Sequence, residues 1–324
     1  MPKVSIVVVN YNYSKYLDER IQSFLNQTYL DFELLIIDNG STDKSVEIIE
    51  KYRKDPRVSV RYYSENEPPF KRWNDGVDST QGEYVMIAAS DDSCDPRLLE
   101  KLVEKLDNHP SVGFAYAQSW EIDDQGKRLY LSKDLTDSLN PDLWATDFVA
   151  NGQEMCHYML FLNIIRFSGL ARRSAFVKAG GFDTRLSYEA DWLLWSKILT
   201  ISDIAYVAEP LIFGRMHMNS FGKAVKKILV LEGRLVVIRY LLSNVKPPEH
   251  FWETVYKPII GYWVRLVFSE KIPISINLRI YCLLKEINPH VNYLLVINFL
   301  EILKRKIGLL YNSFFQKKIK LLLK

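Results

Sequence analysis

Short apolar runs alternate with helical patterns over about the first 110 residues. Residues 4–9 form a continuous, largely β-branched run, which is typical of a strand buried on both faces of a parallel sheet. Similar runs occupy residues 32–37, 58–63 and 84–89, and apolar residues recur at helical spacing between them. This alternation predicts an α/β fold with a Rossmann-like, mostly parallel, doubly wound sheet.

The pattern is less regular in the second third of the chain. Residues 112–118 and 204–208 favour two further strands, a strand turning into a helix is expected at 170–182, and a helix at 187–199. The stretch 120–169 is rich in loops and aromatic residues, which makes it a candidate wall for a second ligand.

Long helical patterns interrupted by prolines begin at about residue 222. The chain length of 324 residues allows one large domain with an appendage, or two domains. We therefore predict a main domain of residues 1–221, with halves of about 1–110 and 111–221, and a helical C-terminal region of residues 222–324.

Composition and charge exclude several classes of protein. A hydrophobic content of 48% indicates a folded chain, and a net charge of +3 is too small to argue for a nucleic-acid partner. Three cysteines that lie far apart, without zinc-site spacing, favour a reducing compartment over a disulfide framework.

The end of the chain is basic. Residues 291–324 hold seven Lys or Arg against the single acid Glu301, interleaved with Leu, Ile and Phe. Such a basic amphipathic helix can lie on an anionic membrane surface, or it can pack on the main domain with a solvated basic face. The sequence leaves both interpretations open.

Nothing in the sequence predicts export or membrane insertion. The first apolar run is too short for a signal peptide, and no segment approaches the length of about 18 apolar residues needed to span a bilayer. We expect a cytoplasmic protein, peripheral at the inner face of the plasma membrane if the tail binds lipid.

Polar clusters follow three of the predicted strands, at residues 10–12, 38–43 and 91–92. The carboxyl ends of parallel strands lie side by side, and ligands bind at that edge of an open α/β sheet. Each cluster alone could be a helix cap or a solvated turn. Together they predict one ligand-binding crevice, in which Asp91-Asp92 could hold a hard cation such as Mg²⁺ or Mn²⁺.

Five segments in order resemble the inverting family 2 nucleotide-sugar glycosyltransferases of GT-A fold, over residues 3 to 220 or so. Residues 4–12 look like that family's opening strand and residues 32–43 like its second strand. Residues 82–92 look like its DXD-type metal motif. Gly180-Gly181-Phe182-Asp183 and Glu189-Ala190-Asp191-Trp192 match its later motifs.

The resemblance implies a donor half, residues 1–110, and an acceptor half, residues 111–221. In the donor half it implies that Asp92 binds Mg²⁺ or Mn²⁺, with help from His217 in a late Arg-x-His segment. The residues implied to bind the nucleotide sugar are Asn10, Tyr11, Asn12, Asp38, Asn39, Lys71, Arg72 and Asp91.

In the acceptor half the resemblance makes Asp191 the general base, because inversion by direct displacement needs a carboxylate that takes the proton of the attacking hydroxyl. The family's usual acid before the base is Ala190 here, so either Glu189 substitutes for it or that acceptor contact is lost. Residues implied at the acceptor are Trp144, Asp183, Glu189 and Trp192. Trp73 and Trp120 are further candidates for stacking on a sugar.

The function implied is metal-dependent transfer of a sugar from a nucleotide diphosphate to a hydroxyl of a saccharide or lipid-linked saccharide, in cell-surface polysaccharide synthesis. Many members carry an acid where this chain has Asn39, and an acid can accept a hydrogen bond from the imide of uracil. Asn39 can also accept that bond through its side-chain carbonyl, although its amide donates as well. UDP is therefore favoured as the nucleotide, while dTDP and GDP stay open. The alternatives are a nucleotidyltransferase, which would usually show a glycine-rich phosphate loop, and a non-catalytic glycan-binding or membrane scaffold of the same fold.

Overall fold

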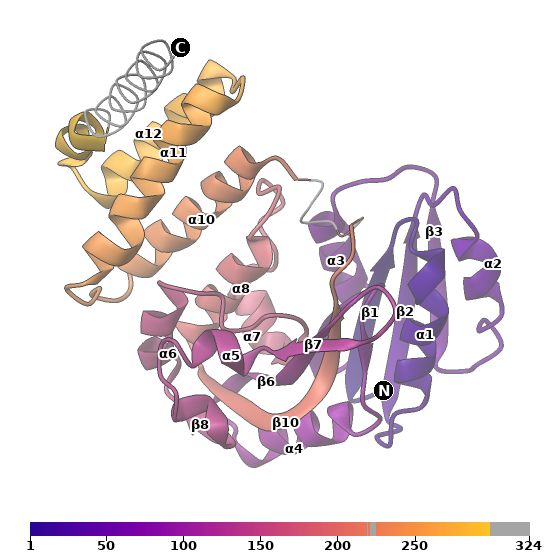
Figure 1. Cartoon of the computed structure of the whole chain (residues 1–324). Helices are drawn as coiled ribbons and strands as arrows, with labels where there is room; N and C mark the ends of the chain where they lie inside the picture. The colour runs from indigo at the N-terminus through magenta and orange to yellow at the C-terminus, as the bar shows by residue number, and fades with distance from the viewer. Residues whose placement is uncertain (219, 221–224, 299–324) are drawn as a thin grey trace, which may run out of the picture.

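A mixed β-sheet with helices on both faces forms the centre of the molecule (Figure 1). The computed structural model describes residues 1–218, 220 and 225–298. The strands within them are β1 (Val4–Asn10), β2 (Phe32–Asn39), β3 (Val58–Tyr63), β4 (Tyr84–Ala89), β5 (Ser93–Cys94), β6 (Val112–Ile122), β7 (Arg128–Leu131), β8 (Phe148–Ala150), β9 (Gly169–Arg172) and β10 (Asp203–Arg215). Along the sheet they follow the order β3-β2-β1-β4-β9-β6-β10-β5, with β7 beside β6 and β8 beside β10.

The first half of the sheet is parallel, as predicted. β1 pairs with both β2 and β4, and β2 pairs with β3, all in the parallel sense. The register sets Asn10 directly beside Asp38, so the polar clusters that follow β1 and β2 meet at one edge of the sheet.

The second half of the sheet is mixed. β9 runs antiparallel between β4 and β6, and β10 is parallel to β6. β10 extends to Arg215, well beyond the predicted end at residue 208, because its pairing shifts register around Pro210 and then resumes. Its far end pairs with β5, which brings Arg215 to the acids that follow β4.

Helices cover the two faces of the sheet unequally. In the described part of the chain they are α1 (Ser14–Leu25), α2 (Ser45–Glu50), α3 (Pro69–Asp78), α4 (Leu98–Asn108), α5 (Lys133–Thr136), the 3₁₀ turn η1 (Leu143–Ala145), α6 (Gly152–Met159), α7 (Arg173–Lys178), α8 (Ala190–Leu199), α10 (Lys227–Leu242), the π-helical turn η2 (Trp252–Tyr256), α11 (Lys257–Ser269) and α12 (Ile274–Ile287). Apolar residues of α1, α2 and α4 bury one face of the sheet, and those of α3, α6, α7 and α8 bury the other.

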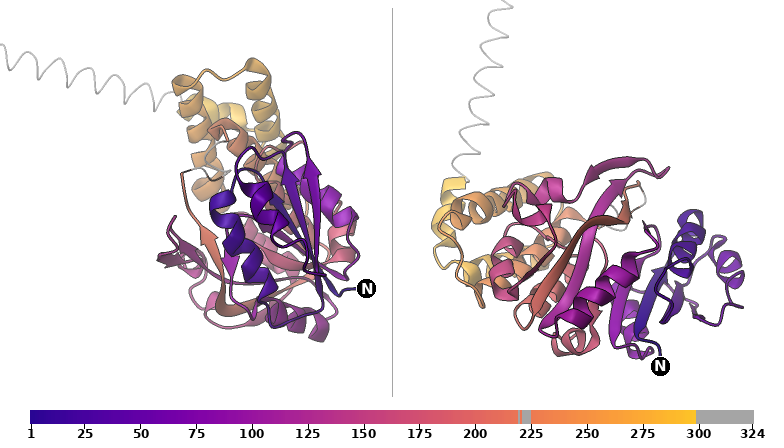
Figure 2. Two further views of the ribbon diagram at one scale, coloured as in Figure 1. Left: turned by 90° about the vertical axis from the view of Figure 1, so that its right-hand side faces the viewer. Right: turned by 90° about the horizontal axis from the view of Figure 1, so that it is seen from below.

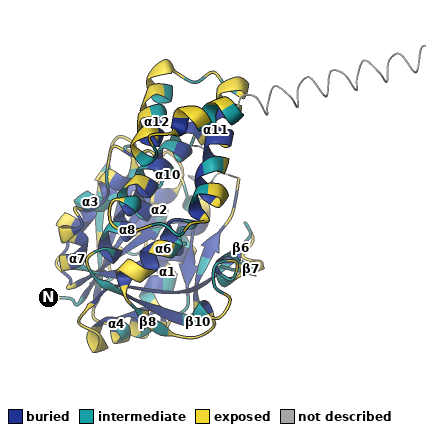
Figure 3. Cartoon of the chain, turned by 90° about the vertical axis from the view of Figure 1, so that its left-hand side faces the viewer, coloured by how far each residue is buried: buried dark blue, intermediate teal, exposed yellow. Residues whose placement is uncertain are grey.

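The helices after residue 225 pack on α8 and extend the second of these cores. Leu235 and Ile238 of α10 and Ile260 of α11 are fully buried in the same hydrophobic cluster as Trp195 of α8. Figure 2 shows these helices, in orange and yellow, at the end of the molecule opposite the indigo strands. The outer sides of α11 and α12 are largely exposed (Figure 3).

The predicted division at residue 221 stays a prediction. Of the basic tail predicted over residues 291–324, residues 299–324 lie outside the described residues. Within the described ranges, every helix is too short or too polar to cross a membrane.

Candidate active site

The polar groups that follow β1 and β2 bind one another. The side chain of Asn10 donates to Asp38 Oδ1 and to Ser41 Oγ, at 3.1 Å each, and Asp38 Oδ2 accepts the backbone N–H of Ser41 at 3.0 Å. Asn12 adopts a left-handed backbone (φ 58°), and its side-chain oxygen accepts the Thr42 N–H at 2.7 Å. Asn10 and Asp38 are buried, and Tyr11 is exposed beside them.

Asn39 and Arg72 fix the loop between β3 and α3. Asn39 donates to Asn66 Oδ1 and to the Glu67 carbonyl, and its oxygen accepts from Glu67 N and from Arg72 Nε at 2.8 Å. Its two amide hydrogens and its oxygen are thus engaged within the protein. The Arg72 guanidinium is buried 3.4 Å above the Tyr63 ring, and the half-exposed Lys71 pairs with Glu67. The predicted nucleotide contacts of these three residues stay predictions.

Asp91 and Asp92 lie where β4 ends, and the end of β10 holds both. Asp91 Oδ2 is 3.0 Å from His217 Nε2, and Asp92 Oδ1 accepts the Arg215 backbone N–H at 2.9 Å. The Arg215 guanidinium donates to the Asp91 carbonyl and pairs with Glu19 of α1 at 2.7 Å. The structure therefore joins the predicted metal motif to the predicted Arg-x-His segment.

Burial and the neighbouring Asp91 carboxylate raise the pKa of Asp92 to about 7, while the positive charges of Arg20 and Arg215 act to lower it.

Arg20 of α1 was not predicted as a site residue, because in the sequence it is one residue of an amphipathic helix. Its guanidinium is fully buried, 4.3 Å over the Phe24 ring, and none of its three nitrogens has a hydrogen-bond partner.

The donor set at Asp92 fits a cation that is shared with a substrate. Within the described residues, no group of three or more His, Cys, Asp or Glu side chains could enclose a metal by itself. Mg²⁺ commonly takes only one or two protein carboxylates and completes its shell with phosphate oxygens and water. Asp92 lines the pocket described next, so its carboxylate can hold such a cation while a diphosphate supplies further ligands. His217 Nε2 is occupied by Asp91, which leaves Nδ1 for any contact with the metal.

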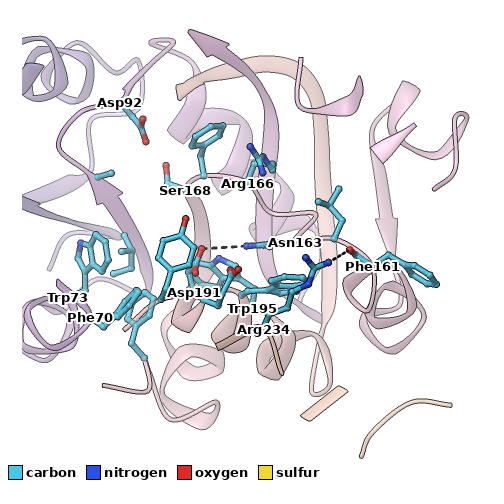
Figure 4. A pocket seen from close by; sticks show the side chains of 18 residues that line it. Phe70, Trp73, Asp92, Phe161, Asn163, Arg166, Ser168, Asp191, Trp195 and Arg234 are labelled. Atoms are coloured by element: carbon cyan, nitrogen blue, oxygen red, sulfur yellow. Dashed lines mark hydrogen bonds between the residues drawn. The ribbon is translucent and has the colours of Figure 1, made fainter. Parts of the chain in front are cut away.

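A pocket of about 390 Å³ lies between the acids of the sheet edge and the start of α8 (Figure 4). Asp92 lines one side, and Asp191 lines it together with Glu189, Trp192 and Arg234. Aromatic residues form much of the wall, namely Phe70, Trp73, Phe161, Phe167, Phe182, Tyr188 and Trp195. The structure thus brings together residues that are about 100 positions apart in the sequence.

Asp191 stands in the first turn of α8. Burial raises the pKa of its carboxyl above the ordinary value, and hydrogen bonds from the backbone N–H groups of Asp191 and Trp192 oppose this rise. Asn163 Nδ2 lies 3.5 Å from its Oδ2. A carboxylate at a helix N-terminus, facing a largely apolar pocket, is suited to accept a proton from a bound hydroxyl.

Glu189 precedes the helix in a left-handed conformation (φ 63°). Burial and the Asp191 charge raise the pKa of Glu189 to about 8, while Arg234 and Arg166 act in the opposite direction. Helix α10 packs closely against this turn at Gly233, where an added Cβ atom would lie 2.5 Å from the Tyr188 carbonyl oxygen. The C-terminal region therefore shapes the pocket directly.

Two predicted acceptor residues do not reach the pocket. Trp144 is buried in the hydrophobic core, where its Nε1 donates to the Tyr116 hydroxyl at 2.7 Å. Asp183 pairs with Arg185 in a groove between the main domain and helices α10 and α12. Both residues were chosen from sequence position and residue type, which do not specify the direction of a side chain.

Other pocket residues were missed. Arg166, Ser168 and Asn163 come from the loop-rich stretch predicted as a wall, and Arg234 comes from α10. Trp73 and Trp192 line the pocket, as stacking candidates should, whereas Trp120 is absent from its lining. A lone arginine in a long helical pattern carries no signal that could have identified Arg234.

Comparison with known proteins defines the family. Residues 5–169 match the sequence model of the family described as glycosyl transferase family 2. The chain belongs to this family. It is similar to an uncharacterized glycosyltransferase of Haemophilus influenzae, with 28% identity over 221 residues, 67% of each chain. It is also similar to one of Rickettsia typhi, with 30% identity over 220 residues, 67% of this chain and 64% of the relative.

Solved structures support the GT-A fold of this family 2 glycosyltransferase. S. aureus TarS 1–349 in complex with UDP-GlcNAc aligns with a TM-score of 0.65 and 18% identity, over 90% of this chain and 83% of that one. The mannosyltransferase PcManGT of Pyrobaculum calidifontis, in complex with GDP-Man and Mn²⁺, aligns with a TM-score of 0.57 and 15% identity, over 93% and 87%. The predicted fold and enzyme class are confirmed, and the chemistry is glycosyl transfer from a nucleotide sugar.

Proposed function

We propose that this glycosyltransferase is an inverting, metal-dependent enzyme that transfers a sugar from a UDP-sugar to a hydroxyl of a saccharide or lipid-linked saccharide. The observation that carries the proposal is the placement of Asp92 and Asp191 on one pocket. A carboxylate that can hold a cation and a carboxylate that can take a proton are the two groups that the proposed metal-dependent displacement uses.

The proposed reaction assigns one role to each acid. Asp191 accepts the proton of the acceptor hydroxyl as its oxygen forms the new bond to the anomeric carbon. The bond from that carbon to the diphosphate oxygen breaks on the opposite face, which inverts the configuration. When bound, the cation neutralises the charge that develops on the leaving diphosphate.

Comparison with the neighbours favours these choices. One neighbouring structure contains UDP-GlcNAc and another contains GDP-Man with Mn²⁺. UDP is our proposed nucleotide, and Mg²⁺ or Mn²⁺ our proposed cation. Family membership favours a glycosyltransferase over the nucleotidyltransferase and the non-catalytic scaffold considered from the sequence.

The proposed setting is the inner face of the plasma membrane, in polysaccharide synthesis. Several large apolar side chains of the C-terminal helices are exposed, among them Ile274 at 78% and Leu278 at 58%. The tail that follows is basic in sequence. Apolar side chains combined with basic charge favour an anionic lipid surface.

Calorimetric titration with UDP, GDP and dTDP, each with and without Mn²⁺, tests the donor half of the proposal. We expect Mn²⁺-dependent binding of UDP that is at least about tenfold weaker in Asp92→Ala. Asp142→Ala serves as control, because Asp142 is exposed and does not line the pocket. Failure of every nucleotide to bind in the presence of Mn²⁺ would refute the proposal.

A further inference from the structure

The loop between α6 and β9 reaches the proposed base. Residues 160–168 form this loop, and its Asn163 lines the same pocket as Asp191 of α8. Both side chains are half-buried, so a ligand in the pocket can reach them. Figure 4 shows the Asn163 amide directed toward Asp191, with a dashed line between them. The carboxylate is therefore contacted from outside its own helix.

A tight turn fixes the direction of the Asn163 amide. Its Oδ1 accepts the backbone N–H of Ile165 at 3.2 Å. Asn side chains commonly bond the backbone two residues further on in this way. Because the oxygen is held by the backbone, the amide nitrogen is the atom directed at Asp191, and Nδ2 lies 3.5 Å from Oδ2. The turn thus gives Asp191 a donor rather than an acceptor.

The contact has the properties expected of a group that orients a base. Within the described residues, Asn163 is the one side chain within hydrogen-bond distance of the Asp191 carboxylate. A separation of 3.5 Å is long for a hydrogen bond. In enzymes without substrate, catalytic hydrogen bonds are often long and shorten in the complex. A donor at one oxygen fixes the plane of the carboxylate and favours its charged form.

The other titratable groups that face Asp191 come from three elements. Arg166, in the same loop as Asn163, favours the ionised carboxylate. Glu189 and Tyr188, in the turn before α8, also interact with its charge, and Arg234 of α10 acts on Glu189. Burial raises the pKa of Asp191, so this base needs donors and positive charge around it to stay ionised.

We propose that Asn163 is a positioning residue for Asp191, whose amide holds the carboxylate in the orientation that takes the proton of the attacking hydroxyl. This inference rests on the proposed function, in which Asp191 is the base. Two segments then set the geometry of the base, namely the first turn of α8 and a loop residue 28 positions earlier in the chain.

Two substitutions remove the donor and keep the turn. In Asn163→Ser the hydroxyl can still accept the Ile165 N–H, but the side chain ends one bond short of the amide nitrogen. In Asn163→Asp an oxygen replaces that nitrogen, so a second carboxylate faces Asp191. A residue that only shaped the loop would tolerate both changes.

Asn151→Asp is the matched control. Asn151 forms the same kind of turn, because its Oδ1 accepts the Gln153 N–H at 3.0 Å. Its Nδ2 also lies 3.5 Å from a carboxylate oxygen, that of Asp203. Neither Asn151 nor Asp203 lines the pocket. The control therefore makes the same chemical change away from the proposed base.

The first measurement is UDP release by the full chain from UDP-glucose and UDP-GlcNAc, with Mn²⁺, at pH 6 and pH 9. Water takes the place of the acceptor hydroxyl and gives its proton to Asp191. Asn163→Ser should release UDP about tenfold more slowly at pH 6 and recover part of that loss at pH 9, and Asn163→Asp should lose more. UDP affinity, measured by calorimetry, should stay unchanged in both variants and in Asn151→Asp, which should also keep its rate.

The second measurement does not depend on turnover. The Asp191 carboxyl is followed by ¹³C NMR as the pH is raised without metal, and its signal is identified by its absence from Asp191→Asn. It should titrate at a higher pH in Asn163→Asp than in the wild type, because two neighbouring carboxylates resist ionising together. In Asn151→Asp it should titrate as in the wild type.

Three results would overturn the inference. They are a wild-type rate in Asn163→Ser at both pH values, a loss that is equal at both and accompanied by weaker UDP binding, and an unchanged titration of Asp191 in Asn163→Asp. Failure of the proposed function has a different signature, because UDP would then not bind, or Asp191→Asn would keep the wild-type rate. If neither donor releases UDP, the titration alone supports or overturns the contact.

Discussion

The crevice at the sheet edge has two regions that differ in how many of their buried polar groups are bonded within the protein, although Asn10 Oδ1 in the first region also lacks a partner among the described residues. Beside β1 and β2, the side chains of Asn10, Asp38 and Asn39 are bonded to each other and to loop backbone. Across the sheet edge, the pocket around Asp191 holds donors that lack partners. Most hydrogen bonds of the first region are made within the fold, whereas several buried donors of the second have no partner within the described residues.

This difference separates residues that stabilise the fold around the site from residues that line the pocket. A satisfied buried network stabilises the fold and fixes its loops, whereas each unpaired buried donor costs about 1–3 kcal/mol that only water or a ligand can return. Substitutions in the two regions should therefore affect different measurements.

The largest effect is expected for Asp191, the proposed base. Asp191→Asn should lower turnover by about 10²–10⁴-fold, because the amide cannot accept the acceptor's proton, and should leave UDP affinity unchanged. UDP release from the donor measures the rate and calorimetry the affinity. A variant that keeps its turnover would remove Asp191 from the reaction.

The satisfied region should respond in stability. Asn39→Ala leaves Arg72 Nε and the Glu67 N–H without their acceptor, which should cost about 2–3 kcal/mol in urea unfolding. Trp192→Phe, in the pocket, loses no hydrogen bond at Nε1 but leaves a small cavity, so it should lose less free energy of unfolding than Asn39→Ala. Equal losses in the two variants would contradict the comparison.

Glu189 gives a pH-dependent form of the same test. Its pKa is about 8 in the folded protein and about 4.3 when unfolded, so the folded state holds the extra proton between these values. Stability from this residue is complete below about pH 4 and is lost as the pH rises through 8. Glu189→Gln should remove that loss. The free energy of unfolding of the variant relative to the wild type should therefore be on the order of 2 kcal/mol higher at pH 9 than at pH 6. Glu253→Gln, at an exposed ion pair, should show no such trend.

The smallest expected effect concerns the membrane. Ile274→Ser and Leu278→Ser, one turn apart on α12, should together weaken binding to vesicles that contain anionic phosphatidylglycerol by about three- to tenfold. Val177→Ser is the control, because Val177 is equally exposed but lies on α7. Flotation of the full chain measures the bound fraction, and identical flotation of the variants would exclude α12 as a contact.

The sequence predicted the parallel half of the fold well, because its strands are continuous apolar runs that end on polar clusters. Periodicity also located α8, although it begins at Ala190 rather than at residue 187, since Glu189 takes a left-handed turn. β10 was predicted too short, because a proline interrupts its pattern and only the pairing with β6 and β5 shows that the strand continues.

The site was predictable as far as single residues carry a chemical signature. Asp92 could be chosen as one of two adjacent acids after a predicted strand, and Asp191 from the family resemblance, and both line one pocket. Arg20 and Arg234 could not, since their importance comes from burial beside residues distant in sequence. Trp144 shows the opposite error, in which a residue suited to sugar binding fills the core.

The contact at Gly233 has a consequence for engineering hybrid enzymes. The family-model match ends at residue 169, so a graft of that segment alone would carry Asp92, the proposed cation ligand, without Asp191, the proposed base. The Tyr188 carbonyl oxygen lies too close to Gly233 to allow a side chain at residue 233, so the turn before α8 and helix α10 should be transferred together. A chimera that exchanges acceptor preference should therefore take residues 186–242 together.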